Sequence, residues 1–427
     1  MTSVDSRESA PPAPAMPGDL MTSWQRVKTV LVLGSLIAVG PLTIDMYLPA
    51  LPAITEDLLT NAAAVQLTLT GTLAGVALGQ LLIGPLSDAV GRRRPLLAGA
   101  VVHVLASLLC AVAPNVTVLG ALRVVQGLAV SAAAVVAMAV VRDLFSGLGV
   151  ARVLSRLMLV MGVAPVLAPT LGGEVLRWTD WRGVFVALAG ISVILLAVTA
   201  FGLPETLPPE RRRRGGIAGT ARAYRSLLRD RVFVGLVLVT GLAMAAVFAY
   251  VSGSSFVFQE QYGMSEQGFA VVFGLGAIGL VAASQVNVVL LRYFRPARIL
   301  AASVVAGALC ALFLLLFAVT GFGGLPAILV PLWGVLATVA LINPNAAALA
   351  MSRHGEAAGT AAALLGSAQF GVGAVAAPMV GAIGTGGGAM AAVVAASMVL
   401  ALAALLLIVR PARLVTEVPA VAPVAAH

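Results

Sequence analysis

The chain has 427 residues, of which 60% are hydrophobic and only 10% are charged. Soluble domains carry roughly 25% charged residues, so this composition excludes a water-soluble fold. The formal net charge of +9 comes from basic residues dispersed over short loops, which indicates membrane topology and argues against a nucleic-acid partner.

Twelve apolar stretches divide the chain into two sets of six. A helix needs about 20 apolar residues to cross a bilayer, and the stretches have that length. They fall at about 28–49, 64–86, 95–113, 118–141, 154–175 and 183–203, then at 232–256, 269–291, 297–320, 325–350, 357–384 and 388–409. The predicted architecture is an all-α integral membrane protein with a disordered tail at 1–24, a six-helix bundle at 25–203, a cytoplasmic linker at 204–231, a second six-helix bundle at 232–410 and a tail at 411–427.

The basic residues predict which side of the membrane each loop occupies. Lys and Arg near helix ends mark the cytoplasmic side, because they resist translocation. If the N-terminus is cytoplasmic, all of these residues except Arg123, Arg177 and Arg182 fall on that side. We therefore expect both termini to be cytoplasmic.

Asp45 is the one carboxylate, of 17 Asp and Glu residues, that lies clearly inside an apolar stretch. Counted from Val30 at about 1.5 Å per residue, it lies roughly 22 Å along the first helix, in its outer half. Charge at bilayer depth costs about 2.5–3.5 kcal/mol, so such a residue is a functional candidate. Because desolvation favours the neutral carboxyl, Asp45 could take up a proton outside and release it inside. The alternative is an aspartate at an early helix end that is hydrated or paired with an arginine.

The segment 84–94 (GPLSDAVGRRR) joins the second and third predicted helices on the cytoplasmic side. Its glycines, Gly84 and Gly91, allow a tight turn. Asp88 could accept hydrogen bonds from a helix N-terminus and pair with Arg92 or Arg93, which would make an ionic latch between the bundles. The alternative is that the arginines only fix the orientation in the membrane.

Arg123 lies near the outer end of the fourth helix. A guanidinium does not readily lose its proton, so it suits biasing a carboxylate such as Asp45 or holding a polar group of a ligand. The alternative is an arginine that snorkels to the interface.

The fifth helix contains the segment 162–173 (GVAPVLAPTLGG), with Pro165 and Pro169 between glycines at Gly162, Gly172 and Gly173. Such a helix bends and allows a neighbour to approach closely, which suits a moving interface between the bundles. Gly71, Gly75 and Gly79 share one face of the second helix in the same way. Packing without motion remains the alternative for these glycines.

The second half offers only neutral polar candidates inside helices. Asn343, Asn345 and Gln369 could line a cavity, although hydrogen bonding between helices is the more frequent role of such residues. His103 and His354 are too far apart in sequence to indicate a metal site by spacing. The phosphate-binding pattern GxxxxGK[ST] is absent from the sequence, which argues against ATP as the energy source.

Taken together, four segments resemble the Major Facilitator Superfamily, and within it the twelve-helix drug:proton antiporters of the Bcr/CflA type. These segments are 41–52 (PLTIDMYLPALP), 84–94, 123–127 (RVVQG) and 162–173. The resemblance implies alternating access by two bundles, with Asp45, Arg123 and Gln126 in proton coupling and Tyr47 at the cavity. It also implies a proton gradient in place of a cofactor, a small lipophilic substrate such as chloramphenicol or bicyclomycin, and a monomer in the bacterial plasma membrane.

Two rival functions stay open at this point. An uptake symporter for a small nutrient would share the fold and the use of protons, but the Pro165/Pro169 segment argues against it. An intramembrane enzyme would need paired catalytic groups at bilayer depth, and the sequence shows one clear carboxylate there and no nucleophile beside a base. We therefore expect a transporter and not an enzyme.

Overall fold

The computed structural model describes residues 17–18, 21–212, 217–354 and 358–410. Most of the predicted tail at 1–24 and all of the tail at 411–427 lie outside these residues. Within them the chain is helical and without strands, and twelve helices are long and apolar enough to cross a membrane. The predicted all-α fold with twelve membrane helices is confirmed.

The first bundle contains six membrane helices, the first of which is interrupted. They are α1 (Ser23–Asp45) with its continuation α2 (Leu51–Asp57), α3 (Ala62–Val90), α4 (Arg93–Ala111), α5 (Val116–Leu144), α6 (Gly147–Leu176) and α7 (Trp181–Gly202). A 3-10 turn at Leu48–Ala50 joins α1 to α2. The sequence predicted that the first helix ends near residue 49, whereas the helical path continues to Asp57. Pro49 and Pro52 each lie at the start of a new helical segment, where the missing N–H group of proline costs little.

The second bundle repeats this arrangement. Its helices are α9 (Arg231–Ser255) with a π-helical extension (Phe256–Gln261), α10 (Glu266–Leu290), α11 (Pro296–Thr320), α12 (Gly324–Ser352), α13 (Ala358–Ile383) and α14 (Gly387–Ala404) with an extension (Leu405–Val409). The linker contains a short helix, α8 (Ile217–Leu227), which the sequence analysis had not distinguished from the rest of the polar stretch.

Polar residues fix where several membrane helices begin. Asn61, Asn115 and Ser265 precede α3, α5 and α10, and each side chain accepts a hydrogen bond from the N–H group three residues later. Such caps satisfy N–H groups that have no partner inside the helix. The loops between helices are therefore short and sharply defined.

Glycines allow α3 and α5 to approach backbone to backbone. A Cβ atom at Gly71 would lie 2.7 Å from the carbonyl oxygen of Gly120, and one at Gly75 would collide with the carbonyl oxygen of Val124. Gly127 of α5 faces the carbonyl oxygen of Thr72 in the same way. This is the close packing that small residues permit in membranes. The glycine face predicted for the second helix is thus a packing face.

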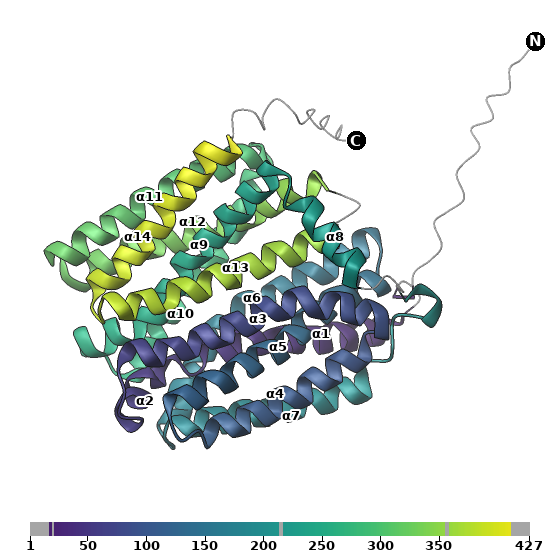
Figure 1. The fold of residues 1–427 in the computed structure, drawn as a ribbon, viewed down its shortest axis with the longest axis horizontal. Helices are drawn as coiled ribbons and strands as arrows, with labels where there is room; N and C mark the ends of the chain where they lie inside the picture. Colours follow the sequence, from purple (N-terminus) through teal and green to yellow (C-terminus); the bar gives the residue numbers. More distant parts are fainter. Residues whose placement is uncertain (1–16, 19–20, 213–216, 355–357, 411–427) are drawn as a thin grey trace, which may run out of the picture.

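The two bundles lie side by side, and α3 packs against α13 and α6 against α10 across their interface (Figure 1). The linker with α8 runs past one end of both bundles, which we call the linker end; the opposite end is the far end. Tyr224 of α8 donates a hydrogen bond to the carbonyl oxygen of Leu81 in α3, at 3.3 Å. The linker helix is therefore bonded to the first bundle, and it also packs against α13 of the second.

Candidate functional site

Asp45 is the last residue of α1, directly before the chain turns into α2. Its side chain is 6% exposed, and it forms no hydrogen bond or ion pair with another described residue. The alternative from sequence, an aspartate at a helix end, is right about the position. It is wrong about the surroundings, since the carboxyl group is buried and no arginine pairs with it.

Arg123 is completely buried in α5, which excludes the snorkelling alternative. Its Nη1 atom donates to the carbonyl oxygen of Thr43 at 2.9 Å and to Oε1 of Gln126 at 2.7 Å. The guanidinium carbon lies 4.1 Å from the centre of the Tyr47 ring, a cation–π contact. Its Nε and Nη2 atoms have no partner among the described residues. Arg123 therefore has unused donors although it is fully enclosed.

Arg123 and Asp45 do not pair in this structure. The guanidinium is bound to the backbone of Thr43, two residues before Asp45 in the chain. The sequence analysis expected Arg123 to act on Asp45, and the structure places the two residues in the same region. In the observed state the cation is held by neutral groups, and the carboxyl group has no counter-ion.

Two tyrosine hydroxyl groups are buried near this region without hydrogen-bond partners in the described chain. One belongs to Tyr47, whose ring lies against Arg123. The other belongs to Tyr250 of α9, which lies within electrostatic range of Asp45 and comes from the second bundle. The Tyr250 ring stacks on Phe273 of α10, with ring centres 5.3 Å apart. Asp45 thus lies where the two bundles meet.

A buried chain of hydrogen bonds extends from Arg123 through the first bundle. Gln126 donates to the Ser107 hydroxyl at 2.7 Å, and Ser107 donates to the carbonyl oxygen of His103 at 2.7 Å. The His103 ring contacts the Thr43 hydroxyl through Nε2 at 2.9 Å and the Ser192 hydroxyl through Nδ1 at 2.8 Å. These residues connect α5, α4, α1 and α7.

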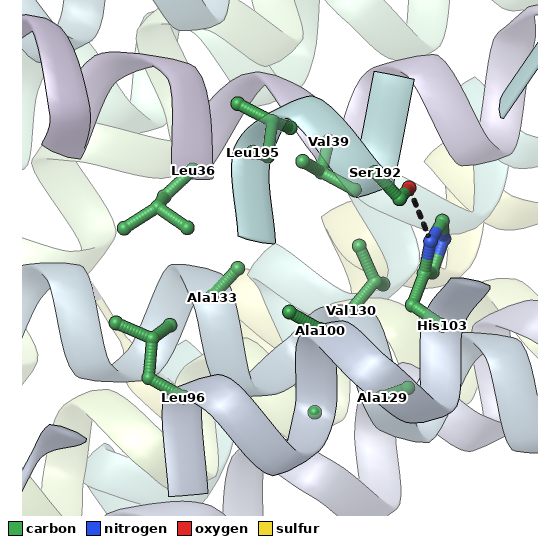
Figure 2. Close-up of a pocket in the computed structure, with 11 residues that line it drawn as sticks. Leu36, Val39, Leu96, Ala100, His103, Ala129, Val130, Ala133, Ser192 and Leu195 are labelled. Carbon is green, nitrogen blue, oxygen red and sulfur yellow. Dashed lines mark hydrogen bonds between the residues drawn. The ribbon is translucent and has the colours of Figure 1, made fainter. Parts of the chain in front are cut away.

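The sequence analysis missed this chain, having considered His103 only as a metal ligand. Figure 2 shows the ring beside Ser192, at one end of a small cavity whose other side chains are apolar. The spacing of His103 and Ser107, four residues apart on one apolar helix, was the available signal, because it places both on the same helix face.

The loop between α3 and α4 is built around the Arg92 side chain. Gly91 has a φ of +99°, which favours glycine. Arg92 contacts Asp88 at 2.5 Å and Asp143 of α5 at 2.8 Å. Both carboxylates belong to the first bundle. The latch expected between the bundles is therefore a clamp within one bundle in this structure.

Glu205 completes this clamp and was not predicted. It lies just after α7 and accepts hydrogen bonds from the backbone N–H groups of Arg92, at 2.8 Å, and Arg93, at 3.2 Å. Partial burial alone would raise the pKa of the Glu205 carboxyl group. Hydrogen bonds from the backbone N–H groups of Leu207, Arg92, Arg93 and Thr206 have the opposite and larger effect, so the pKa is below its usual value. Glu205, not Asp88, thus accepts from the start of α4. Gly84 lies within α3, where an added Cβ atom would make only ordinary contact with Val135, so the turn expected at this glycine is wrong.

A second ionic cluster lies at the linker end of the second bundle. Asp230 caps the start of α9 and contacts Arg353 at 3.1 Å and His354 at 3.0 Å. Burial opposes the charge on Asp230, but hydrogen bonds from Arg353, His354 and the backbone hold its pKa below the usual value. No sequence pattern indicated this cluster, because Asp230 and Arg353 are 123 residues apart.

The proline- and glycine-containing segment of α6 lies at the bundle interface. Gly162 faces Val281 of α10, and Gly173 faces Glu266 at the start of the same helix. Gly172 instead faces the carbonyl oxygen of Met46, next to Asp45. Pro165 and Pro169 lie inside the helix between these contacts. The segment thus connects the bundle interface with the surroundings of Asp45.

The amides of the second bundle divide into two kinds. Asn345 is buried and donates to Oδ1 of Asn287 at 2.7 Å, which ties α12 to α10. It belongs to the packing between helices and not to a cavity. Asn343 is half-buried, with its amide nitrogen 3.2 Å from the sulfur of Met244 and its Oδ1 atom unpartnered in the described chain. Gln369 is half-buried in α13.

Side-chain hydrogen bonds fasten the bundles together at the far end. Gln66 of α3 donates to the carbonyl oxygen of Ser252 at 3.3 Å and accepts from the N–H group of Gly381 at 2.7 Å. Ser255 donates to the carbonyl oxygen of Leu48 at 2.7 Å, and two further pairs of residues are bonded in the same region. These are Gln259 with Pro49 and Gln267 with Gly173. All such bonds between the bundles, within the described residues, lie in this half of the molecule.

Comparison with known proteins identifies the family. Residues 33–378 match the family model described as Major Facilitator Superfamily. An uncharacterized transporter of this type from Bacillus subtilis, YdgK, is 38% identical over 81% of this chain and 86% of its own length. A bicyclomycin resistance protein homolog from Haemophilus influenzae is 32% identical over 81% of this chain and 87% of its own length. A chloramphenicol resistance protein from Pseudomonas aeruginosa is 32% identical over 76% and 78%.

Solved structures show the same fold at low sequence identity. The nucleoside transporter NupG superposes with a TM-score of 0.71 at 13% identity, over 88% of this chain and 99% of its own. A D-xylose-proton symporter superposes with a TM-score of 0.66 at 16% identity, over 88% and 96%. With its twelve helices, its two bundles and these relatives, the chain belongs to the Major Facilitator Superfamily and is a transporter of the Bcr/CflA drug-resistance type.

Proposed function

We propose that this protein is a proton-coupled antiporter that exports small lipophilic drugs from a bacterial cell by alternating access. The observation that carries the proposal is the Asp45 carboxyl group, which is buried at the meeting of the bundles without a counter-ion. A carboxyl group in this setting can exchange a proton for a substrate, because a proton, or a hydrogen-bond donor or positive charge of the substrate, relieves the cost of an isolated buried charge.

The bundle interface supports alternating access. The bonds made by Gln66, Ser255 and Gln259 close the far end. They are hydrogen bonds and not covalent bonds, so they can break and form again. If both termini are cytoplasmic, as the basic loops indicate, the far end is the outer side. Opening the outer side would then require breaking these bonds while Asp45 changes its protonation.

The relatives support a drug as the cargo. Two of them carry names that refer to resistance to bicyclomycin and to chloramphenicol. The aromatic and apolar surroundings of Asp45 suit neutral or weakly cationic lipophilic compounds of this kind. The protein would need no cofactor, since the proton gradient supplies the energy. One chain contains both six-helix bundles and could therefore work as a monomer.

The energetics are compatible with one proton per drug. Moving one charge down 100 mV yields about 2.3 kcal/mol, and a tenfold gradient costs about 1.4 kcal/mol. One proton could therefore maintain an outward gradient of roughly fifty-fold per 100 mV, if exchange moves one net charge.

The remaining candidate function is nutrient uptake with protons, since the fold is shared with a D-xylose-proton symporter. The enzyme alternative is excluded by membership in a transporter family. The direction of transport distinguishes drug export from nutrient uptake. We expect chloramphenicol or bicyclomycin to dissipate a pH gradient across inverted vesicles that contain the protein. Uphill uptake into right-side-out vesicles, driven by an inward proton gradient, would contradict export.

The matched variant is Asp45→Asn. Cells that produce the wild type should resist at least one lipophilic antibiotic in a susceptibility panel, and the variant should lose this resistance. Undiminished resistance in the variant would remove Asp45 as the obligatory proton site.

A further inference from the structure

His103 is a buried titratable residue that the proposed antiport does not yet use. Its ring lies between two hydroxyl groups from different helices, Thr43 of α1 and Ser192 of α7. Beyond the ring is the small cavity of Figure 2, which has a volume of about 20 Å³. Apart from His103 and Ser192, it is lined by apolar groups such as Leu36 and Val130. Both ring nitrogens are thus in contact with these hydroxyl groups.

The hydrogen atoms in this arrangement can be counted. The Thr43 hydroxyl also lies 2.7 Å from the carbonyl oxygen of Val39, and the Ser192 hydroxyl lies 2.8 Å from that of Leu188. A neutral imidazole donates from one nitrogen and accepts at the other. The two hydroxyl groups and the ring therefore supply three hydrogen atoms for four contacts. In either tautomer the ring binds both hydroxyl groups when the hydroxyl group that faces its unprotonated nitrogen turns from its carbonyl oxygen to the ring. His103 therefore clamps α1 to α7 at the level of Thr43.

Two routes connect this clamp to Arg123. The first runs through α1, because the carbonyl oxygen of Thr43 accepts from Nη1 of Arg123. The second runs through α4 and α5, because Gln126 binds the same Nη1 atom and also Ser107, which donates to the His103 backbone. The Thr43 acceptor is therefore held through the His103 ring, whereas the Gln126 acceptor is held through the His103 backbone, which remains when the side chain is replaced.

The ionisable groups near the clamp come from four helices. They are Asp45 on α1 and Tyr47 in the turn that follows it, His103 and Cys110 on α4, Arg123 on α5 and Tyr250 on α9. The adjoining face of α7 contributes the neutral groups Ser192 and Phe185. Among these residues, Arg123 is the one arginine or lysine, and its Nε and Nη2 atoms are unused.

We propose that His103 is a positioning residue that holds Arg123 on the Thr43 backbone and away from Asp45. The proposal rests on the proposed function, in which Asp45 exchanges a proton. With the clamp intact, Asp45 keeps its proton until the bundles move. Without it, α1 is free at Thr43, and the guanidinium can turn its unused donors toward the carboxylate.

Three substitutions separate positioning from simple packing. His103→Leu removes both hydrogen bonds. In His103→Gln the amide takes the place of Nε2 and can still reach Thr43, whereas in His103→Asn it takes the place of Nδ1 and can reach only Ser192. Since the route to Arg123 runs through Thr43, Gln should preserve the function of the clamp and Asn should not.

The experiment is an infrared titration of the purified protein in lipid nanodiscs, which needs no drug. The carboxyl band lost in Asp45→Asn belongs to Asp45. A cation within about 4–6 Å lowers a carboxyl titration by 1–3 pH units, so we expect the midpoint of this band to move about one unit lower in His103→Leu and His103→Asn. His103→Gln should titrate close to the wild type.

Each outcome decides between the proposals. If Asp45→Asn removes no titrating band, proton exchange at Asp45 is wrong, whatever His103 does. If the band is present but its midpoint in His103→Asn equals that of the wild type, the positioning role is wrong and proton exchange at Asp45 stands. Equal midpoints in His103→Asn and His103→Gln would also contradict the role, and these two variants keep the test open if His103→Leu does not fold.

Discussion

The two bundles share one fold but differ in the groups that they bury. The first encloses Asp45, Arg123 and His103 within its helices. In the described part of the second bundle, the buried polar residues inside the helices are neutral, with Asn287 and Asn345 as the amides. Since a charge at bilayer depth is expensive, its confinement to one bundle indicates a division of labour. We infer that the first bundle carries the proton chemistry and that the second supplies the surface against which it works.

The largest effect should come from Arg123. Arg123→Lys keeps the charge, but its Nζ atom falls about one atom short of Nη1, the single atom that binds both Thr43 and Gln126, and the flat contact with Tyr47 is lost. Losing two charge-assisted bonds of about 1.5–3 kcal/mol each predicts a fall of tenfold or more in drug-dependent proton exchange in vesicles. Arg298→Lys, an exposed position of the second bundle, is the control. Equal activity of the two variants would contradict the division of labour.

Arg92 allows the comparison to be made at the linker end. Arg92→Ala leaves Asp88 and Asp143 without their cation, and unsatisfied groups of this kind cost about 1–3 kcal/mol. We expect thermal unfolding in detergent to occur at a clearly lower temperature. Arg292→Ala, in the corresponding loop of the second bundle, should change little because the side chain is exposed. A larger loss in Arg292→Ala than in Arg92→Ala would show that the clamp does not stabilise the first bundle.

Glu205 predicts a pH dependence of stability. Hydrogen bonds from four backbone N–H groups outweigh burial and hold its pKa below the usual value. A carboxyl group with a lowered pKa stabilises the fold above its unfolded pKa, and this contribution is lost as the pH falls through the folded pKa. Wild type should therefore lose more stability than Glu205→Gln between about pH 5 and pH 3, since the loss begins near the unfolded pKa and continues to the lower folded pKa. The check is the unfolding temperature of both proteins across this range; parallel curves would speak against the assignment.

The smallest effect is expected in the amide pair of the second bundle. Asn345→Leu leaves Asn287 buried without its partner, and such bonds in membranes average about 0.6 kcal/mol. The double variant Asn287→Leu/Asn345→Leu should recover most of this loss, because no polar group is then left unpaired. Unfolding temperature and vesicle transport measure the two effects. A loss of proton coupling in the double variant would mean that the second bundle also takes part in the chemistry.

The fold could be predicted from sequence because membrane helices are specified locally. Runs of apolar residues, caps such as Asn61 and small residues such as Gly75 act within a helix or between adjacent ones. The break between α1 and α2 was only partly read, since Pro49 gives the place but not the path beyond it. The linker helix contacts distant segments, with Tyr224 bonded to Leu81 and α8 packed against α13, and no local pattern reveals these contacts.

The candidate site could be predicted only as a set of isolated charges. Asp45 and Arg123 were found because charge within an apolar helix is conspicuous. The absence of a direct contact between them could not be read, since it depends on Thr43, Gln126 and Ser107, whose types are ordinary in membrane helices. Glu205 and Asp230 were missed for the same reason, because their partners are distant in sequence.

The most direct test of the division of labour is the number of protons released when drug binds. In weakly buffered detergent solution, chloramphenicol should release about one proton per bound molecule from the wild type, since one carboxyl group is exchanged. Asp45→Asn should release none, and Asn343→Leu in the second bundle should release as many per bound molecule as the wild type. Release from Asp45→Asn equal to that of the wild type would contradict the account.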